Sequence, residues 1–272
     1  MTTSRVRLIA ILVGAVATTA GTGALADDFG AQNGGDGSLS RACAGLPSQA
    51  ALKTALTTAR NQLNGGFNLD MWGTVVNRDG LVCAVAFTGA NRGDQWPGSR
   101  VISAQKANTA NDFSLPALAL STADLYYATQ PGGTLYGLQH SNPVDPQVAY
   151  RGPAANFGMS DDPMVGRRIG GVNVFGGGLA LYNAQHVLVG AVGVSGDSSC
   201  ADHNIAWRTR HTLGLDHVTG GVGTDKSRLD NIVYDITPQP GQQEGISASG
   251  WGHPVCSAAS VTISESLPVT TP

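Results

Sequence analysis

The sequence predicts an α+β fold, an α/β sandwich in which helices pack on the faces of a largely antiparallel central sheet. Two observations lead to this prediction. The predicted strands come in hairpins joined by short turns that contain glycine, and helical segments stand before, between and after those hairpins. Strands joined by a tight hairpin run antiparallel, so a doubly wound parallel sheet does not fit the order of elements.

The first helix is expected to begin after Leu46-Pro47-Ser48, since proline suits a helix start and apolar residues then recur every three or four positions until Gly65. A strand pair follows over 71–76 and 81–87, with a turn at 77–80 in which Gly80 can adopt positive φ. The remaining expected elements are helices from 99 to Pro116, 117–129 and 199–213, and strands at 172–175, 179–183, 187–195 and 231–236. The strand at 187–195 is almost continuously apolar, which predicts a central position buried on both faces.

The first 26 residues have the pattern of a cleavable secretory signal peptide. Arg5 and Arg7 precede an uncharged segment over 8–20, and Ala24-Leu25-Ala26 provides the small residues that signal peptidase recognises. Residues 27–45, poor in apolar side chains, are expected to form a flexible leader. Cleavage would leave 14 of the 16 basic residues against 19 acidic ones, a formal charge of −5, which argues against a nucleic-acid partner.

Four cysteines are scattered along the chain at Cys43, Cys83, Cys200 and Cys256. An even number at distant positions in an exported chain predicts two disulfides, and the sequence leaves all three pairings open. Zinc sites built from cysteine contain closely spaced pairs, which this chain lacks.

Among polar residues, Lys106 has two interpretations, a surface lysine or a cation that faces a ligand. The densest group of potential metal ligands is formed by three histidines and two aspartates on or just after the helix at 199–213. Because Trp207 and two arginines share this helix, it is interpreted as an amphipathic surface element with structural histidines. The group comprises Asp202, His203, His211, Asp216 and His217.

Three segments, taken together, resemble the GlcG/HbpS-like family of haem-binding proteins, which is related to the C-terminal domain of PduO-type proteins. They are the strand-turn-strand with Asn77-Arg78-Asp79-Gly80, the helix segment 104–110 (AQKANTA), and the strand 189–196 (VGAVGVSG). The resemblance covers 46–217. It is interrupted by an insertion at about 139–169 that has no sustained apolar periodicity, and a C-terminal extension over 218–272 follows it. Cys256 in this extension is a candidate to tether it to the core, with Cys200 as one candidate partner.

The resemblance also implies a homo-oligomer that binds haem or a related tetrapyrrole and has no catalytic constellation. The family's haem-associated region corresponds to residues 131–136 here, which makes Thr134 and His140 the candidates to face the iron. Tyr136 and Lys106 are further candidate cofactor-binding residues. For an exported member, the implied role is haem capture or sensing beside a membrane-bound sensor or transporter. Two alternatives stay open: a haem-degrading or redox enzyme on the same fold, and a structural or signalling partner without a ligand.

Overall fold

The computed structural model describes residues 36–271. The predicted signal peptide and the first part of the predicted leader lie outside this range. The end of the leader is not the flexible segment that the sequence predicts: residues Asp36–Ala42 form helix α1, and Cys43 is disulfide-bonded to Cys83. Within the described range, no helix has both the length and the apolar character needed to cross a membrane.

A four-stranded antiparallel sheet forms the centre of the domain, as predicted. Its strands are β1 (Trp72–Asn77), β2 (Val82–Phe87), β3 (Gly178–Tyr182) and β4 (Leu188–Ser195), arranged in the order β2-β1-β4-β3. Val75 of β1 lies opposite Ala84 on one side and Val192 on the other. The prediction of a central, buried strand at 187–195 is confirmed by β4.

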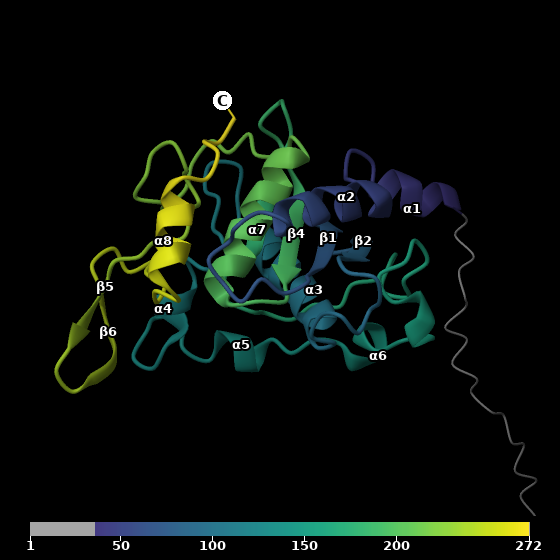
Figure 1. Cartoon of the computed structure of the whole chain (residues 1–272). Helices are drawn as coiled ribbons and strands as arrows, with labels where there is room; N and C mark the ends of the chain where they lie inside the picture. Colours follow the sequence, from purple (N-terminus) through teal and green to yellow (C-terminus); the bar gives the residue numbers. More distant parts are fainter. Residues whose placement is uncertain (1–35, 272) are drawn as a thin grey trace, which may run out of the picture. The chain divides into compact units, whose positions relative to one another are not determined.

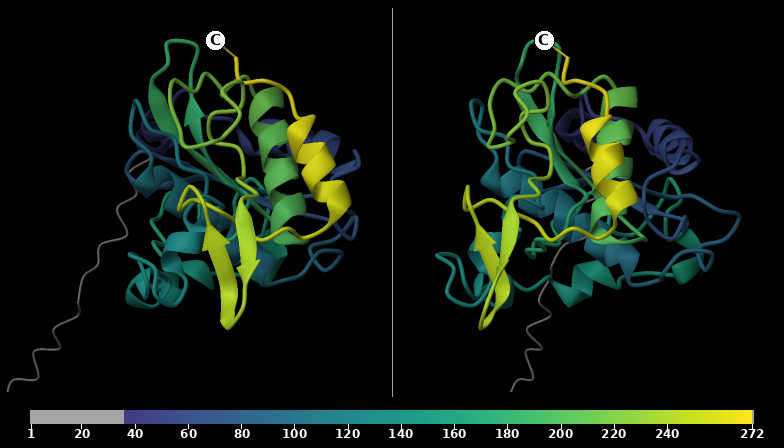
Figure 2. Two further views of the ribbon diagram at one scale, coloured as in Figure 1. Left: turned by 90° about the vertical axis from the view of Figure 1, so that its left-hand side faces the viewer. Right: turned by 60° about the vertical axis from the view of Figure 1, so that its left-hand side comes forward.

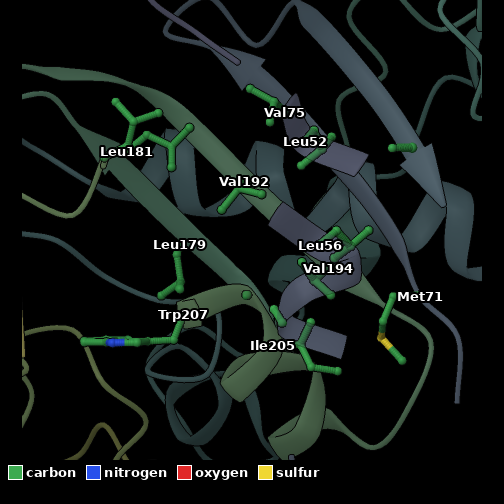
Figure 3. Close-up of a cluster of buried hydrophobic side chains, with 14 of the residues drawn as sticks. Leu52, Leu56, Met71, Val75, Leu179, Leu181, Val192, Val194, Ile205 and Trp207 are labelled. Carbon is green, nitrogen blue, oxygen red and sulfur yellow. The ribbon is translucent and has the colours of Figure 1, made fainter. Parts of the chain in front are cut away.

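One face of the sheet is covered by helices α2 (Gln49–Arg60) and α7 (Ser199–Thr212), as Figure 1 shows. Ser48 caps α2 by accepting the backbone N–H of Ala51, which fixes the start of the predicted helix. The leucines of α2 point at valines of β1 and β4, and Trp207 of α7 closes the same cluster (Figure 3). This cluster is the main hydrophobic core.

Helix α3 (Ser99–Phe113) covers the opposite face, and it lies unusually close to the sheet. Gly193 of β4 pairs with Gly178 of β3, so two glycines stand side by side under the helix. A Cβ atom at Gly193 would lie 2.0 Å from the Ser103 carbonyl oxygen, and one at Gly178 would lie 2.4 Å from that of Lys106. No side chain other than hydrogen fits at either position.

The connection between α3 and β3 contains short helical turns, α4 (Tyr126–Thr129), α5 (Leu138–Ser141), α6 (Pro146–Ala149) and the 3₁₀ turn at Ala154–Asn156. The helix predicted over 117–129 is wrong except for its last turn, α4. The backbone N–H of Ala119 instead donates to Gly220, which holds this stretch in a non-helical conformation. The strand predicted at 172–175 is also wrong. The backbone N–H of Val172 donates a hydrogen bond to the Asn142 carbonyl of the insertion and not to a strand of the sheet.

The C-terminal extension packs against α7. It contains the hairpin of β5 (Ile236–Gln239) and β6 (Gln242–Ser247) and helix α8 (Ala258–Glu265), which runs beside α7 in Figure 2. The strand predicted at 231–236 is wrong except at its last residue, because β5 covers Ile236–Gln239. Asn204 of α7 donates to the Ser260 carbonyl (3.2 Å), and Trp207 Nε1 donates to that of Pro268 (2.9 Å).

Because of this cover, α7 is not the surface helix that the sequence predicts. Arg210 is completely buried and forms a two-point ion pair with Asp230, with N···O distances of 2.5 and 2.8 Å. His203 is also completely buried, with its ring Nε2 3.1 Å from Asn231 Oδ1. Burial lowers the pKa of His203 from 6.5 to about 3. The expectation that this histidine is structural fits its position.

We expect Gly193→Ala to destabilise the domain by about 3 kcal/mol or more, because the added methyl group meets backbone atoms of α3 that cannot rotate away. Urea unfolding monitored by circular dichroism measures the change. Gly93→Ala is the matched control, since nothing lies within 4 Å of a Cβ there. Equal stability of the two variants would contradict the close packing of α3 on β4.

The pKa of His203 predicts how stability depends on pH. The unfolded chain protonates this histidine near 6.5 and the folded chain only near 3, so the unfolded state binds more protons in between, and stability falls as the pH falls. The difference in unfolding free energy between wild type and His203→Gln should shrink by up to about 1.4 kcal/mol per pH unit between about pH 6 and pH 4. Parallel curves for the two proteins would contradict the burial of His203.

Candidate functional site

Of the residues that the family resemblance indicated for haem, Thr134 and Tyr136 lie between α4 and α5, and His140 lies in α5. Leu135 and Leu138 point inward and pack on the cluster around Leu125. Thr134, Tyr136 and His140 are exposed; Tyr136 has 64% of its surface accessible. The three exposed side chains form no hydrogen bond or ion pair within residues 36–271. The structure therefore places them within one short segment, 134–140, without enclosing them.

Lys106 lies elsewhere and is not a surface residue. It is 1% exposed, with Nζ 2.7 Å from Asp202 Oδ2 and 3.1 Å from the Val194 carbonyl oxygen. Burial raises the pKa of the Asp202 carboxyl to about 6, although the ammonium group of Lys106 acts in the opposite direction. The amine of Lys106 is thus engaged in an internal ion pair that joins α3 to α7, so the interpretation as a surface lysine is wrong, and the interpretation as a cofactor-binding cation stays a prediction.

A cavity of about 570 Å³ opens at the start of α3. Its lining residues come from β1, from the loop after β2, from the first turn of α3 and from the segment that follows α6. Figure 1 labels these four elements. Its lining is Trp72, Asn91, Arg92, Gly93, Pro97, Gly98, Arg100, Val101, Tyr150, Ala154 and Phe157. None of the residues proposed from the sequence belongs to it.

One wall of the cavity is held in place by Arg100. This side chain is 2% exposed and forms a two-point ion pair with Asp162, in which Nε is 2.9 Å from Oδ2. Its Nη1 donates to the Ala149 carbonyl (2.8 Å), and its guanidinium lies 3.7 Å from the centre of the Phe157 ring. Because Asp162 also accepts the Gly158 backbone N–H (2.7 Å), one ion pair fixes the insertion against α3.

Several polar groups in this lining have no hydrogen-bond partner among the described residues. The indole N–H of Trp72 is buried and has no hydrogen-bond partner in the described part of the chain. Arg92, at the mouth, and Tyr150, with 67% of its surface accessible, form no hydrogen bond or ion pair with any described residue. Buried N–H groups are almost always satisfied, so that of Trp72 is an unusual unpaired donor in the wall of the cavity.

The sequence contained little signal for this cavity. Tyr150 and Phe157 belong to the insertion, whose lack of apolar periodicity predicted only a loop. Arg92 and Trp72 come from other segments, and only the pairing of Arg100 with Asp162, 62 positions apart, brings the walls together.

Comparison with known proteins identifies the family. The family model described as "haem degrading protein HbpS-like" matches residues 47–210. Two solved structures are similar: a PduOC:heme complex, at 22% identity over 60% of this chain and 89% of that one (TM-score 0.42), and Klebsiella pneumoniae protein ORFY, a DUF336 protein, at 23% identity over 61% and 90% (TM-score 0.41). A search of curated proteins found no match.

The matched region contains the whole sheet and α2, α3 and nearly all of α7, so it is the domain core that carries the family pattern. The sequence resemblance noted in three segments is confirmed, and the C-terminal extension over 218–272 lies beyond the matched residues. The chain belongs to the HbpS-like family.

Proposed function

We propose that this protein binds haem or a related tetrapyrrole outside the cytoplasm, for haem capture or sensing, and that the cavity at the start of α3 is the site. The observation that carries the proposal is a cavity of about 570 Å³ with largely apolar walls and unpaired polar groups. Small-molecule sites typically have roughly 300–1,000 Å³ and this kind of lining. Family membership supports the class of ligand.

The chemistry of the lining fits haem, a flat aromatic molecule with two carboxylates. Phe157 and Tyr150 offer aromatic surfaces against which the macrocycle can pack. Arg92 at the mouth can pair with a carboxylate that points to solvent. Tyr150 supplies a phenol oxygen, which is a known type of haem-iron ligand. When bound, haem would supply an iron centre for sensing or redox chemistry.

The segment from Thr134 to His140 is the second candidate location, proposed from the family resemblance. Its exposed side chains cannot exclude water within one chain, so a haem bound there needs a second copy to cover it. A homo-oligomer of this kind, and a membrane-bound sensor or transporter that receives haem from it, are parts of the proposal.

The cavity predicts how haemin titrations respond to substitutions. Wild type should show a saturable Soret band, and Tyr150→Phe should shift this band and weaken binding by about tenfold or more. Gly98→Phe should abolish binding by filling the cavity, because nothing lies within 4 Å of a Cβ at Gly98 and its φ of −63° suits any residue. Thermal unfolding of the variants verifies that they are folded.

The controls for this titration are Thr134→Ala and His140→Ala. Loss of binding in these variants, with Gly98→Phe unaffected, would place the haem on the segment from Thr134 to His140. The absence of any saturable spectrum in wild type would falsify haem binding and leave the ligand-free role. With ascorbate present, a Soret band that decays in wild type would show haem degradation instead of storage.

Export of the protein predicts the first residue of the mature chain and the oxidation state of its cysteines. Intact-mass analysis of protein recovered from outside the cytoplasm should give a chain that begins at Asp27, with both disulfides formed. Retention of Met1 in a cytoplasmic protein with four free thiols would contradict the proposed location.

A further inference from the structure

Cys200, His253 and Cys256 form a compact group outside the cavity. One potential ligand atom from each residue, the two Sγ atoms and a ring nitrogen, lies within 4.8 Å of the others. Cys200 Sγ is 4.0 Å from His253 Nδ1, and the two cysteines are joined in a disulfide. Cys200 stands at the start of α7, whereas His253 and Cys256 belong to the C-terminal extension, beyond the family match at 47–210.

We propose that this group is a redox-gated metal site, in which a dithiol reductant opens the disulfide and the two cysteine thiolates and His253 then bind Zn²⁺ or a similar thiolate-preferring ion. Cysteine and histidine are the protein ligands that Zn²⁺ prefers, and three of them leave a fourth position for water. The site is independent of haem binding, since no member of it lines the cavity.

The disulfide is accessible from one end only. Cys256 is exposed, while Cys200 and His253 are buried. A thiolate of the reductant can therefore attack Cys256 Sγ and displace Cys200 as a thiolate. The second thiol of the reductant then attacks its own sulfur in the mixed disulfide and releases Cys256. The reductant becomes a cyclic disulfide, and its two hydrogens end on Cys200 and Cys256.

The first turn of α7 stabilises the thiolate of Cys256 after the reductant has released it. The backbone N–H of Cys200 donates to Cys256 Sγ at 3.2 Å. A sulfur at a helix N-terminus is favoured as a thiolate, because unpaired N–H groups and the helix dipole stabilise negative charge there. Metal binding displaces the two thiol protons, so the charge of the ion is balanced by two thiolates.

His253 is held in the manner of a ligating histidine. Its Nε2 lies 2.7 Å from Ser199 Oγ, and its Nδ1 lies 2.7 Å from the Pro254 carbonyl oxygen. In the disulfide form, Nδ1–H donates to Pro254 and Nε2 accepts from the Ser199 hydroxyl. For Nδ1 to bind the ion, the ring proton moves to Nε2 and is donated to Ser199 Oγ. Metal-bound histidines almost always have such a partner on the other nitrogen.

The backbone spacing allows the change. Two thiolates on one tetrahedral Zn²⁺ lie about 3.8 Å apart, given Zn–S bonds of about 2.3 Å. The Cα atoms of Cys200 and Cys256 are 6.0 Å apart, so rotation about the Cα–Cβ bonds suffices to separate the sulfurs to that distance. The ion would then replace the disulfide as the link between α7 and the extension.

The test uses the full-length mature protein, reduced with dithiothreitol, freed of reductant without oxygen, and titrated with Co²⁺ as a spectroscopic substitute for Zn²⁺. The expected result is one equivalent of Co²⁺ with thiolate charge-transfer absorption and tetrahedral ligand-field bands, which Zn²⁺ then displaces. His253→Gln, which keeps the disulfide, should weaken binding at least tenfold, and Ser199→Ala should weaken it about tenfold. Zn²⁺ should also raise the melting temperature of the reduced protein.

Three comparisons make the test decisive. The oxidised protein should give no thiolate charge-transfer band, and His186→Asn, which changes an exposed histidine outside both candidate sites to a residue that tolerates its φ of 58°, should bind as the wild type does. Cys256→Ser should lose the band, whereas replacing Cys43 and Cys83 with Ser should preserve it. A wild-type protein without the band, or His253→Gln with unchanged affinity, would overturn the proposal.

Discussion

The close contact between α3 and the sheet is the constraint on which the rest of the molecule depends. It exists because Gly178 and Gly193 stand next to each other on neighbouring strands and leave no Cβ in the way of the helix backbone. Lys106 thereby reaches Asp202 of α7, and Arg100 reaches the insertion. One pair of glycines thus sets the positions of both helices and of the added segments.

Buried ion pairs connect the helices that cover the sheet to the segment between α3 and β3 and to the C-terminal extension. Only 13% of the residues are charged, yet Arg100 pairs with Asp162 of the insertion and Arg210 pairs with Asp230 of the extension, both almost completely buried. Removing one partner of such a pair leaves an unpaired charge in the interior, which is strongly unfavourable. The insertion and the extension are therefore integral parts of the fold, and each contributes to a candidate site: the insertion to the cavity and the extension to the Cys200–His253–Cys256 group.

The two candidate sites suit different ligands and lie on different parts of the core. The cavity combines apolar walls with an unpaired indole N–H, an arginine and a tyrosine. This lining suits a flat aromatic ligand that carries a carboxylate. The cysteine group offers sulfur and imidazole nitrogen, which is a chemistry for a metal ion. If both are occupied, the extension would report the redox state of the surroundings on the same chain that binds a redox-active ligand.

The sequence by itself determined the antiparallel sheet, the glycine turn of the first hairpin, helices α2, α3 and α7, and the family, because each rests on local periodicity or a short motif. Only the tertiary structure decided which of three disulfide pairings forms, that Lys106 and α7 are buried, and where a cavity opens. These depend on contacts between segments far apart in the chain, as when the extension covers α7 or Asp162 meets Arg100. Local pattern carries no information about such contacts, so burial and site geometry had to come from the folded molecule.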